Sequence, residues 1–228
     1  MILNLRRMSL LGQAELDSRS WARSLRASAK ILMVCLAGFL LSWLVLRVLA
    51  FPADKDIALV IYNAGSNKTV ASLGWVIATV GEDIWMPLVL WLYVFRNNRY
   101  GWTSATLFAV SIILSMILVD LLKALFGLPR PPEVTGLGID YRVGSPTNAA
   151  FPSGHTSRAF TVATVIWTRY PKWRIPLLAL ALATGISMIM IGYHFPSDVL
   201  GGAFTGIAIG TFTVNLARVR ADRETVTG

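Results

Sequence analysis

The sequence predicts an all-α fold, a six-transmembrane helix bundle, from its composition and from the length of its apolar runs. Of the 228 residues, 55% are hydrophobic and only 14% are charged, whereas a soluble domain carries roughly 25% charged residues. A membrane-spanning helix needs about 20 mostly apolar residues. We therefore expect one helical domain over residues 31–217, preceded by a basic segment, residues 1–30, and followed by a tail, residues 218–228.

The first apolar run, residues 31–51, is the clearest of six expected spans. It is longer than the roughly 7–15 apolar residues of a signal peptide, so we expect a retained membrane anchor. The six spans are expected over residues 31–51, 84–95, 103–126, 155–167, 175–193 and 199–217. The stretch 57–80 mixes polar and apolar residues, which predicts an interfacial or partly re-entrant segment.

Basic residues gather in the segments that six spans would place on one side of the membrane. These segments are the N-terminus, the connections after the second and fourth spans, and the C-terminal tail. The positive-inside rule makes this side cytoplasmic. The opposite side receives segments 52–82, 127–152 and 194–198. We therefore expect any active site built from these segments to face the extracytoplasmic side, in a bacterial inner membrane.

Charge and cysteine content exclude two other classes of protein. The net charge of +9 is explained by basic loops that flank membrane spans rather than by nucleic-acid binding, because the Lys and Arg residues lie between the apolar runs. One cysteine, Cys35, and two histidines leave too few ligands for a Cys/His zinc site. We expect no metal, no other cofactor and no obligate protein partner.

The first segment that could carry chemistry contains Lys123 and Arg130. Lys123 ends an apolar run, and Arg130 stands between Pro129 and Pro131, where an extended or turn conformation is expected. A cation at the end of a span can simply reach toward lipid headgroups. A Lys and an Arg held next to prolines also suit a fixed clamp for phosphate oxygens, and we favour that interpretation.

The second segment, Pro152-Ser153-Gly154-His155, opens the fourth expected span. Ser153 is a natural N-cap residue, and Gly154 lets the backbone approach a ligand closely. A helix N-terminus offers free N–H groups and a favourable dipole to an anion. An ordinary cap with an incidental histidine is the simpler alternative. We predict that Ser153 and Gly154 contact a phosphate, with His155 beside the same anion.

The third segment runs from Ser187 to Asp198 and contains His194. Pro196 disfavours helix at the preceding residue, so we expect the fifth span to end near His194. Asp198 then falls in the first turn of the sixth span, where its carboxylate can hold one imidazole nitrogen and leave the other to attack. A surface histidine with a capping aspartate would be the simpler alternative, but ionisable groups near membrane spans are functional candidates by default.

At these residues the chain resembles the type 2 phosphatidic acid phosphatase superfamily, and within it the phosphatidylglycerol phosphate and undecaprenyl diphosphate phosphatases. The family pattern is Lys, six residues and Arg-Pro, then Pro-Ser-Gly-His, then Ser-Arg, five residues, His, three residues and Asp. The spacing from Lys123 through His155 to Asp198 matches throughout, and the resemblance covers roughly residues 80–217.

The resemblance implies a metal-independent phosphatase that acts on a lipid phosphate or diphosphate entering from the bilayer. His194 would attack phosphorus and form a phosphohistidine, and Asp198 would orient it. His155 would protonate the leaving oxygen and then activate water. The other motif residues would hold the phosphate oxygens: Lys123, Arg130, Ser153 and Gly154. The same nucleophile would also serve a lipid phosphotransferase.

One position departs from the family pattern, because Met188 stands where the pattern has Arg. A thioether cannot bind phosphate, and the loss of one oxyanion donor costs roughly 2.7–4 kcal/mol in other enzymes. We expect Arg158, three residues beyond His155 on one helix face, to compensate; Arg142 is the alternative. The departure also leaves open a weakly active or non-catalytic protein that binds lipid phosphates.

Overall fold

The computed structural model describes residues 26–79, 101–136 and 149–227. All of its regular elements in these ranges are helices. Four helices there are long and apolar enough to cross a membrane: Arg26–Leu49, Thr106–Thr135, Pro171–Met190 and Pro196–Ala217. They correspond to the first, third, fifth and sixth expected spans. The second expected span, residues 84–95, lies outside the described residues.

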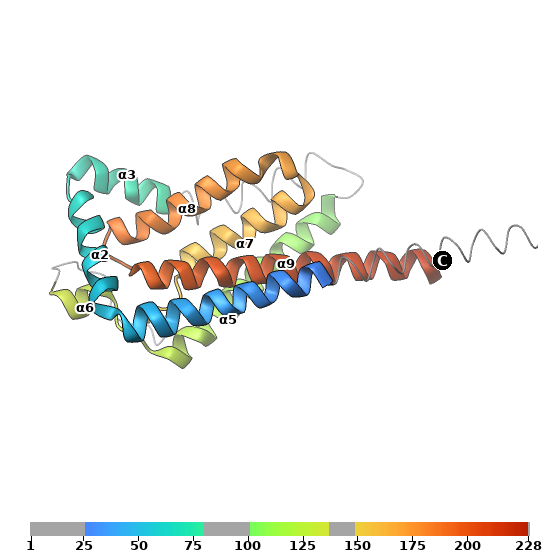
Figure 1. The fold of residues 1–228 in the computed structure, drawn as a ribbon. Coiled ribbons are helices and arrows are strands. Elements are labelled where there is room, and N and C mark those ends of the chain that lie inside the picture. Colours follow the sequence, from blue (N-terminus) through green and yellow to red (C-terminus); the bar gives the residue numbers. More distant parts are fainter. Residues whose placement is uncertain (1–25, 80–100, 137–148, 228) are drawn as a thin grey trace, which may run out of the picture.

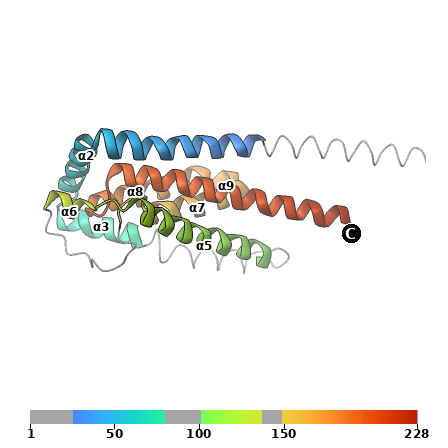
Figure 2. The same ribbon diagram turned by 90° about the horizontal axis from the view of Figure 1, so that it is seen from below.

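The N-terminal part of the described chain is one long helix followed by two short ones. The helix Arg26–Leu49 ends in a π-helical stretch, η1 (Ser42–Leu49). Helix α2 (Phe51–Ala64), which has a proline in its first turn, crosses one end of the bundle in both views (Figures 1 and 2). Helix α3 (Lys68–Thr79) packs against α8. These two short helices occupy the stretch that was expected to be interfacial.

The rest of the bundle is built around α7. The elements are α5 (Gly101–Phe126), α6 (Pro131–Thr135), α7 (Gly154–Arg169), η3 (Pro171–Trp173), α8 (Arg174–Met190) and α9 (Pro196–Thr227). Helix α7 contacts α5, α8 and α9, and its apolar residues Phe160, Val162 and Ala163 lie in the main hydrophobic core. At 16 residues, α7 is shorter than α5, α8 and α9, as its short apolar run predicts.

Two helix ends differ from the expected ones. Helix α8 ends at Met190 rather than near His194. The chain turns at Gly192, whose φ of 76° is easily adopted by glycine, so glycine and not Pro196 ends the helix. Helix α9 continues through Thr227, past the expected end at residue 217, because residues 211–227 contain no glycine or proline.

All three motif segments lie at the same end of the bundle. Helices α5 and α8 end there, and α7 and α9 begin there, close to α2 and α6 (Figures 1 and 2). The start of the first helix, with Lys30, and the connection from α7 to α8, with Lys172, lie at the opposite end. The structure thus separates the motifs from these basic segments along the bundle, as the expected assignment of sides requires.

Glycines of α9 allow α7 to approach at backbone distance. A Cβ atom on Gly202 would lie 2.5 Å from the carbonyl oxygen of Ser153, with no flexible side chain to yield. We expect Gly202→Ala to push α9 away from the first turn of α7 and to lower the free energy of unfolding by about 1–3 kcal/mol. Unfolding in detergent micelles measures this. Gly74→Ala is the control, because its nearest neighbour is a side-chain atom at 3.4 Å; equal destabilisation by both substitutions would contradict the prediction.

Candidate active site

The three motif segments meet through hydrogen bonds that involve the backbone. Ser153 N donates to the carbonyl oxygen of Asp198 at 2.9 Å, which joins the second segment to the third. Two further bonds start from the first segment. Leu128 O accepts from Ala150 N, two residues before the second segment, at 2.8 Å, and Arg130 Nη1 donates to Tyr193 O of the third segment at 3.2 Å. The predicted convergence of the segments is therefore present in the fold.

His194 lies in the turn between α8 and α9, and its side chain is buried together with that of Asp198. Its Nδ1 lies 3.4 Å from Asp198 Oδ2, an oxygen that also accepts a hydrogen bond from Phe195 N at 2.8 Å. A charge-assisted hydrogen bond would be shorter, at about 2.7–2.9 Å. Asp198 therefore stabilises the turn through Phe195 N and also faces the imidazole. Its distance from His194 Nδ1 is longer than that of a charge-assisted hydrogen bond.

The surroundings of His194 favour a neutral imidazole. Burial lowers the pKa of His194 well below its ordinary value of 6.5, and the nearby charges of Arg130, Lys123 and His155 lower it further. A backbone hydrogen bond with Ala150 acts in the opposite direction. The imidazole therefore lies within electrostatic reach of three of the residues that the sequence motifs predict to act with it.

This lowered pKa predicts how acid affects stability. Between the folded-state pKa of His194 and the ordinary 6.5, the unfolded state binds more protons, so stability falls as pH drops below 6.5 and is unaffected by this group above it. We expect wild-type protein to lose more thermal stability than His194→Gln on acidification from about pH 7.5 to about pH 5, around the unperturbed histidine value. Thermal unfolding in detergent checks this, and parallel pH curves for the two proteins would contradict it.

The second segment forms the capped N-terminus that its sequence predicts. Ser153 is the N-cap of α7, and its Oγ accepts hydrogen bonds from Thr156 N at 3.4 Å and from Thr156 Oγ1 at 3.0 Å. Gly154 is the first residue of the helix, and His155, which is half-buried, is the second. The positive end of the α7 dipole is therefore directed to the place where the three segments meet.

The cations of the first segment also lie at this place. Lys123 is 7% exposed near the end of α5. Arg130 is the N-cap of α6 in an extended conformation, with φ −82° and ψ 162°, as its neighbouring prolines predict. Arg158 lies one turn into α7, and its Nη1 would be 3.3 Å from a Cβ atom on Gly154. Arg142 lies outside the described residues.

Met188 occupies an apolar place in the fold. It is 1% exposed and belongs to a buried cluster with Ala78 of α3 and Ile191. An arginine at this position would have to displace part of that cluster. In place of the family's arginine, Met188 therefore makes an apolar contact between α8 and α3.

Two buried charged residues that the sequence analysis did not single out lie next to the third segment. Arg47, in the last turn of the first helix, is 5% exposed, and Asp54, in the first turn of α2, is 2% exposed. Arg47 Nη1 lies 3.9 Å from Asp54 Oδ2. An arginine inside an apolar run was the available signal, because ionisable residues inside membrane spans are rare and functional by default.

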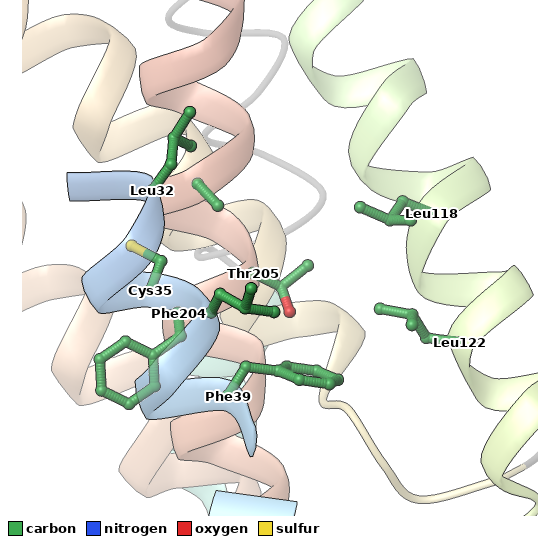
Figure 3. A pocket seen from close by; sticks show the side chains of 9 residues that line it. Leu32, Cys35, Phe39, Leu118, Leu122, Phe204 and Thr205 are labelled. Carbon is green, nitrogen blue, oxygen red and sulfur yellow. The ribbon is translucent and has the colours of Figure 1, made fainter. Parts of the chain in front are cut away.

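An apolar groove of about 210 Å³ opens between the first helix, α5 and α9. Figure 3 shows Leu118 and Leu122 of α5 facing Phe39 and Thr205 across it. The end of the groove at Phe39 lies toward the motif end, since the Phe39 ring lies 5.2 Å from that of Phe151, which precedes the Pro-Ser-Gly-His segment. A hydrocarbon chain would find apolar contacts here.

Comparison with known proteins places these features in a family. Residues 104–222, just over half of the chain, match the PAP2 superfamily. The lipid A 1-phosphatase of Rhizobium etli is 27% identical over 157 residues, which cover 60% of this chain and 67% of that protein. The undecaprenyl-diphosphatase BcrC of Bacillus subtilis is 30% identical over 124 residues, which cover 54% and 61%. The chain spans about two thirds of the length of these curated relatives.

Solved structures share the fold. The crystal structure of a transmembrane PAP2-type phosphatidylglycerolphosphate phosphatase from Bacillus subtilis has a TM-score of 0.65 at 18% identity, and the match covers 84% of this chain and 96% of that one. The crystal structure of Aquifex aeolicus LpxE has a TM-score of 0.59 at 28% identity, with 70% and 93% covered. The matched residues contain all three motif segments, and the described helices include four that can cross a membrane. This chain is therefore an integral membrane protein of the PAP2 superfamily, related to membrane lipid phosphatases.

Proposed function

We propose that this protein hydrolyses a lipid phosphate or diphosphate through a phosphohistidine on His194. The observation that supports this most is the placement of His194 against Asp198 within electrostatic reach of Arg130, Lys123 and His155. Phosphoryl transfer needs mainly positioning and stabilisation of charge, and these residues supply both. The names of the relatives, which include lipid A and undecaprenyl diphosphate phosphatases, support a lipid substrate.

In the first step His194 acts as the nucleophile. Asp198 faces Nδ1, so Nε2 is the nitrogen that attacks phosphorus while the bond from phosphorus to the lipid oxygen breaks. His155 gives its proton to that leaving oxygen. Asp198 stabilises the positive charge that develops on the imidazole, as the acid of a catalytic triad does.

In the second step water replaces the histidine. His155, now neutral, takes a proton from water, and the water oxygen attacks phosphorus while the bond to Nε2 breaks. Inorganic phosphate leaves and His194 is restored. Throughout both steps the phosphate oxygens are held by Lys123, Arg130 and the N–H groups at the start of α7, next to Ser153 and Gly154.

Arg158 takes the part of the cation that is missing at Met188. Its guanidinium lies near Gly154 at the first turn of α7, close to the helix N-terminus at which the phosphate is proposed to bind. We expect Arg158→Ala to lower kcat/KM for phosphate release by about 10²–10³-fold, the scale for one oxyanion donor, and Arg158→Lys to lower it less. Exposed Arg174 is the matched control; near-normal turnover of Arg158→Ala would rule this role out.

The lipid reaches the site from the bilayer, with its hydrocarbon chain in the groove between the first helix, α5 and α9. The groove is apolar, and Leu122 in its wall directly precedes Lys123. The proposed topology has six spans and places both termini in the cytoplasm. The site then lies on the extracytoplasmic face of a bacterial inner membrane. The separation of the motifs from the basic segments supports this orientation.

A phosphate-release panel tests the function. Purified protein is incubated with phosphatidic acid, phosphatidylglycerol phosphate, undecaprenyl diphosphate and lipid A, with EDTA present and with His194→Ala as the control. We expect release from at least one lipid that continues in EDTA and disappears in the variant. A protein that is silent with each lipid alone but active once an acceptor lipid is added would be a phosphotransferase. Saturable lipid binding without any turnover would identify a non-catalytic member, which Met188 would explain.

A further inference from the structure

We propose that Arg47 and Asp54 are positioning residues, a buried ion pair that fixes His194, Asp198 and Arg130 in place without touching the phosphate. This inference rests on the proposed phosphatase function. It adds two residues from the N-terminal helices, which lie outside the three motif segments and outside residues 104–222, which match the family.

Asp54 holds the start of α9. Its Oδ1 accepts a hydrogen bond from Ser197 N at 2.9 Å, and its Oδ2 accepts one from the Ser197 hydroxyl. The first N–H groups of a helix have no hydrogen-bond acceptor inside the helix. Here the Asp54 carboxylate of α2 is the acceptor for one of them, the N–H of Ser197. Because Ser197 directly precedes Asp198, Asp54 holds the backbone from which the proposed orienting carboxylate projects.

Arg47 holds the turn that carries His194. The central guanidinium carbon of Arg47 lies 4.2 Å from the centroid of the Phe195 ring and 4.7 Å from that of the Phe51 ring, distances typical of cation–π contacts. Phe195 is fully buried and directly follows His194. Arg47 therefore packs against the residue next to His194 and helps to fix the backbone of this turn.

Arg47 also holds the loop that carries Arg130. Its Nη2 donates a hydrogen bond to the carbonyl oxygen of Pro129, the residue before Arg130. The ion pair thus touches one sequence neighbour of each of three proposed site residues: Pro129 beside Arg130, Phe195 beside His194, and Ser197 beside Asp198. The three contacts together connect the pair to Arg130, His194 and Asp198 at once.

Other roles for Arg47 do not fit these contacts. A side chain that reaches toward lipid headgroups would be exposed, whereas Arg47 is 5% exposed. A phosphate ligand would present its guanidinium to the anion, whereas that of Arg47 lies against two aromatic rings and the Pro129 carbonyl. Stability alone is also a weak reason for the pair, because a buried ion pair is often no more stable than an apolar replacement.

The test compares Arg47→Met, Arg47→Lys and Asp54→Asn in the full-length protein. The matched controls are Arg26→Met and Asp56→Asn, which remove the same groups from exposed places on the same helices. We expect kcat to fall about 10–100-fold in Arg47→Met and Asp54→Asn, the scale for residues that hold another functional residue in position. KM should rise less than kcat falls, because Arg130 loses part of its support while Lys123 and the start of α7 still bind the phosphate. Arg47→Lys should recover part of the loss. The double variant should lose less than the product of the single losses.

Inorganic vanadate gives a second measurement that needs no turnover. Vanadium can bind a fifth ligand, so vanadate bonded to His194 Nε2 would resemble the transition state of phosphoryl transfer rather than the bound lipid phosphate. Its affinity should therefore follow kcat, and we expect it to fall about tenfold or more in Arg47→Met and Asp54→Asn. Wild-type protein that binds vanadate but releases no phosphate would refute the phosphatase function alone, and the variants would still test positioning. Variants with wild-type kcat and wild-type vanadate affinity would overturn the positioning role. Losses that only follow the fraction of unfolded protein would also overturn it. So would a wild-type protein that neither releases phosphate nor binds vanadate.

Discussion

His194→Ala is expected to abolish phosphate release, lowering kcat by at least about 10⁴-fold, since removing the nucleophile from a unit of cooperating residues costs most of its catalysis. The substitution removes Nε2, the nitrogen proposed to attack phosphorus. Binding of the lipid phosphate should persist, because Lys123, Arg130 and the start of α7 remain. Steady-state phosphate release and equilibrium lipid binding measure the two effects separately.

His155→Ala is the informative comparison for that experiment. His155 is half-buried at the start of α7, and its proposed task is proton transfer, which contributes typically 10²–10⁴-fold. A substrate whose leaving group needs no proton should therefore be cleaved by His155→Ala faster than by His194→Ala. If His194→Ala kept turnover within about tenfold of the wild type, far from the loss expected of a nucleophile, the assignment of His194 would be wrong.

Asp198→Asn is expected to have the second largest effect, a fall in kcat of roughly 10²–10⁴-fold. The amide can still accept the hydrogen bond from Phe195 N, which Oδ2 of the aspartate accepts at 2.8 Å, so the turn should persist. The negative charge that faces His194 Nδ1 at 3.4 Å is lost, and the imidazolium of the phosphohistidine is no longer stabilised. Single-turnover kinetics should show slower formation of the intermediate.

The matched control for Asp198→Asn is Asp56→Asn, which removes an exposed carboxylate from α2. We expect wild-type kcat in this control. If kcat fell by a similar factor in both variants, the loss would result from the removal of a negative charge in general and not from the position of Asp198. An Asp198→Asn enzyme with wild-type single-turnover rates would show that the carboxylate does not assist His194.

The local structure of the motif segments could be predicted where a residue type has a local reason for its place. Ser153 caps α7 as its residue type predicts, and the prolines around Arg130 hold it extended. The placement of His155 and His194 at one end follows from the antiparallel arrangement of successive helices, since α7 begins and α8 ends at the same end of the bundle (Figure 1). Periodicity and turn chemistry were sufficient for these features.

Other features depend on contacts between distant residues, which no local pattern records. Arg47 meets Pro129, 82 positions away, and Asp54 meets Ser197, 143 positions away. In the sequence, Arg47 is one charge in a long apolar run, and its burial follows only from how α2 folds over the end of the bundle. The sequence shows that Met188 replaces the family's arginine, but it does not show that Met188 packs on Ala78 of α3.

The most direct test of the proposed mechanism is chemical trapping of the intermediate on His194. Protein is mixed with a lipid phosphate labelled in the transferred phosphoryl group, quenched in alkaline detergent within one turnover, and digested for peptide mapping. We predict an alkali-stable, acid-labile label on the peptide that contains His194, and we expect this label to be absent from His194→Ala. Phosphate release by the wild type without labelled protein at any quench time, or a label that persists in His194→Ala, would contradict the mechanism.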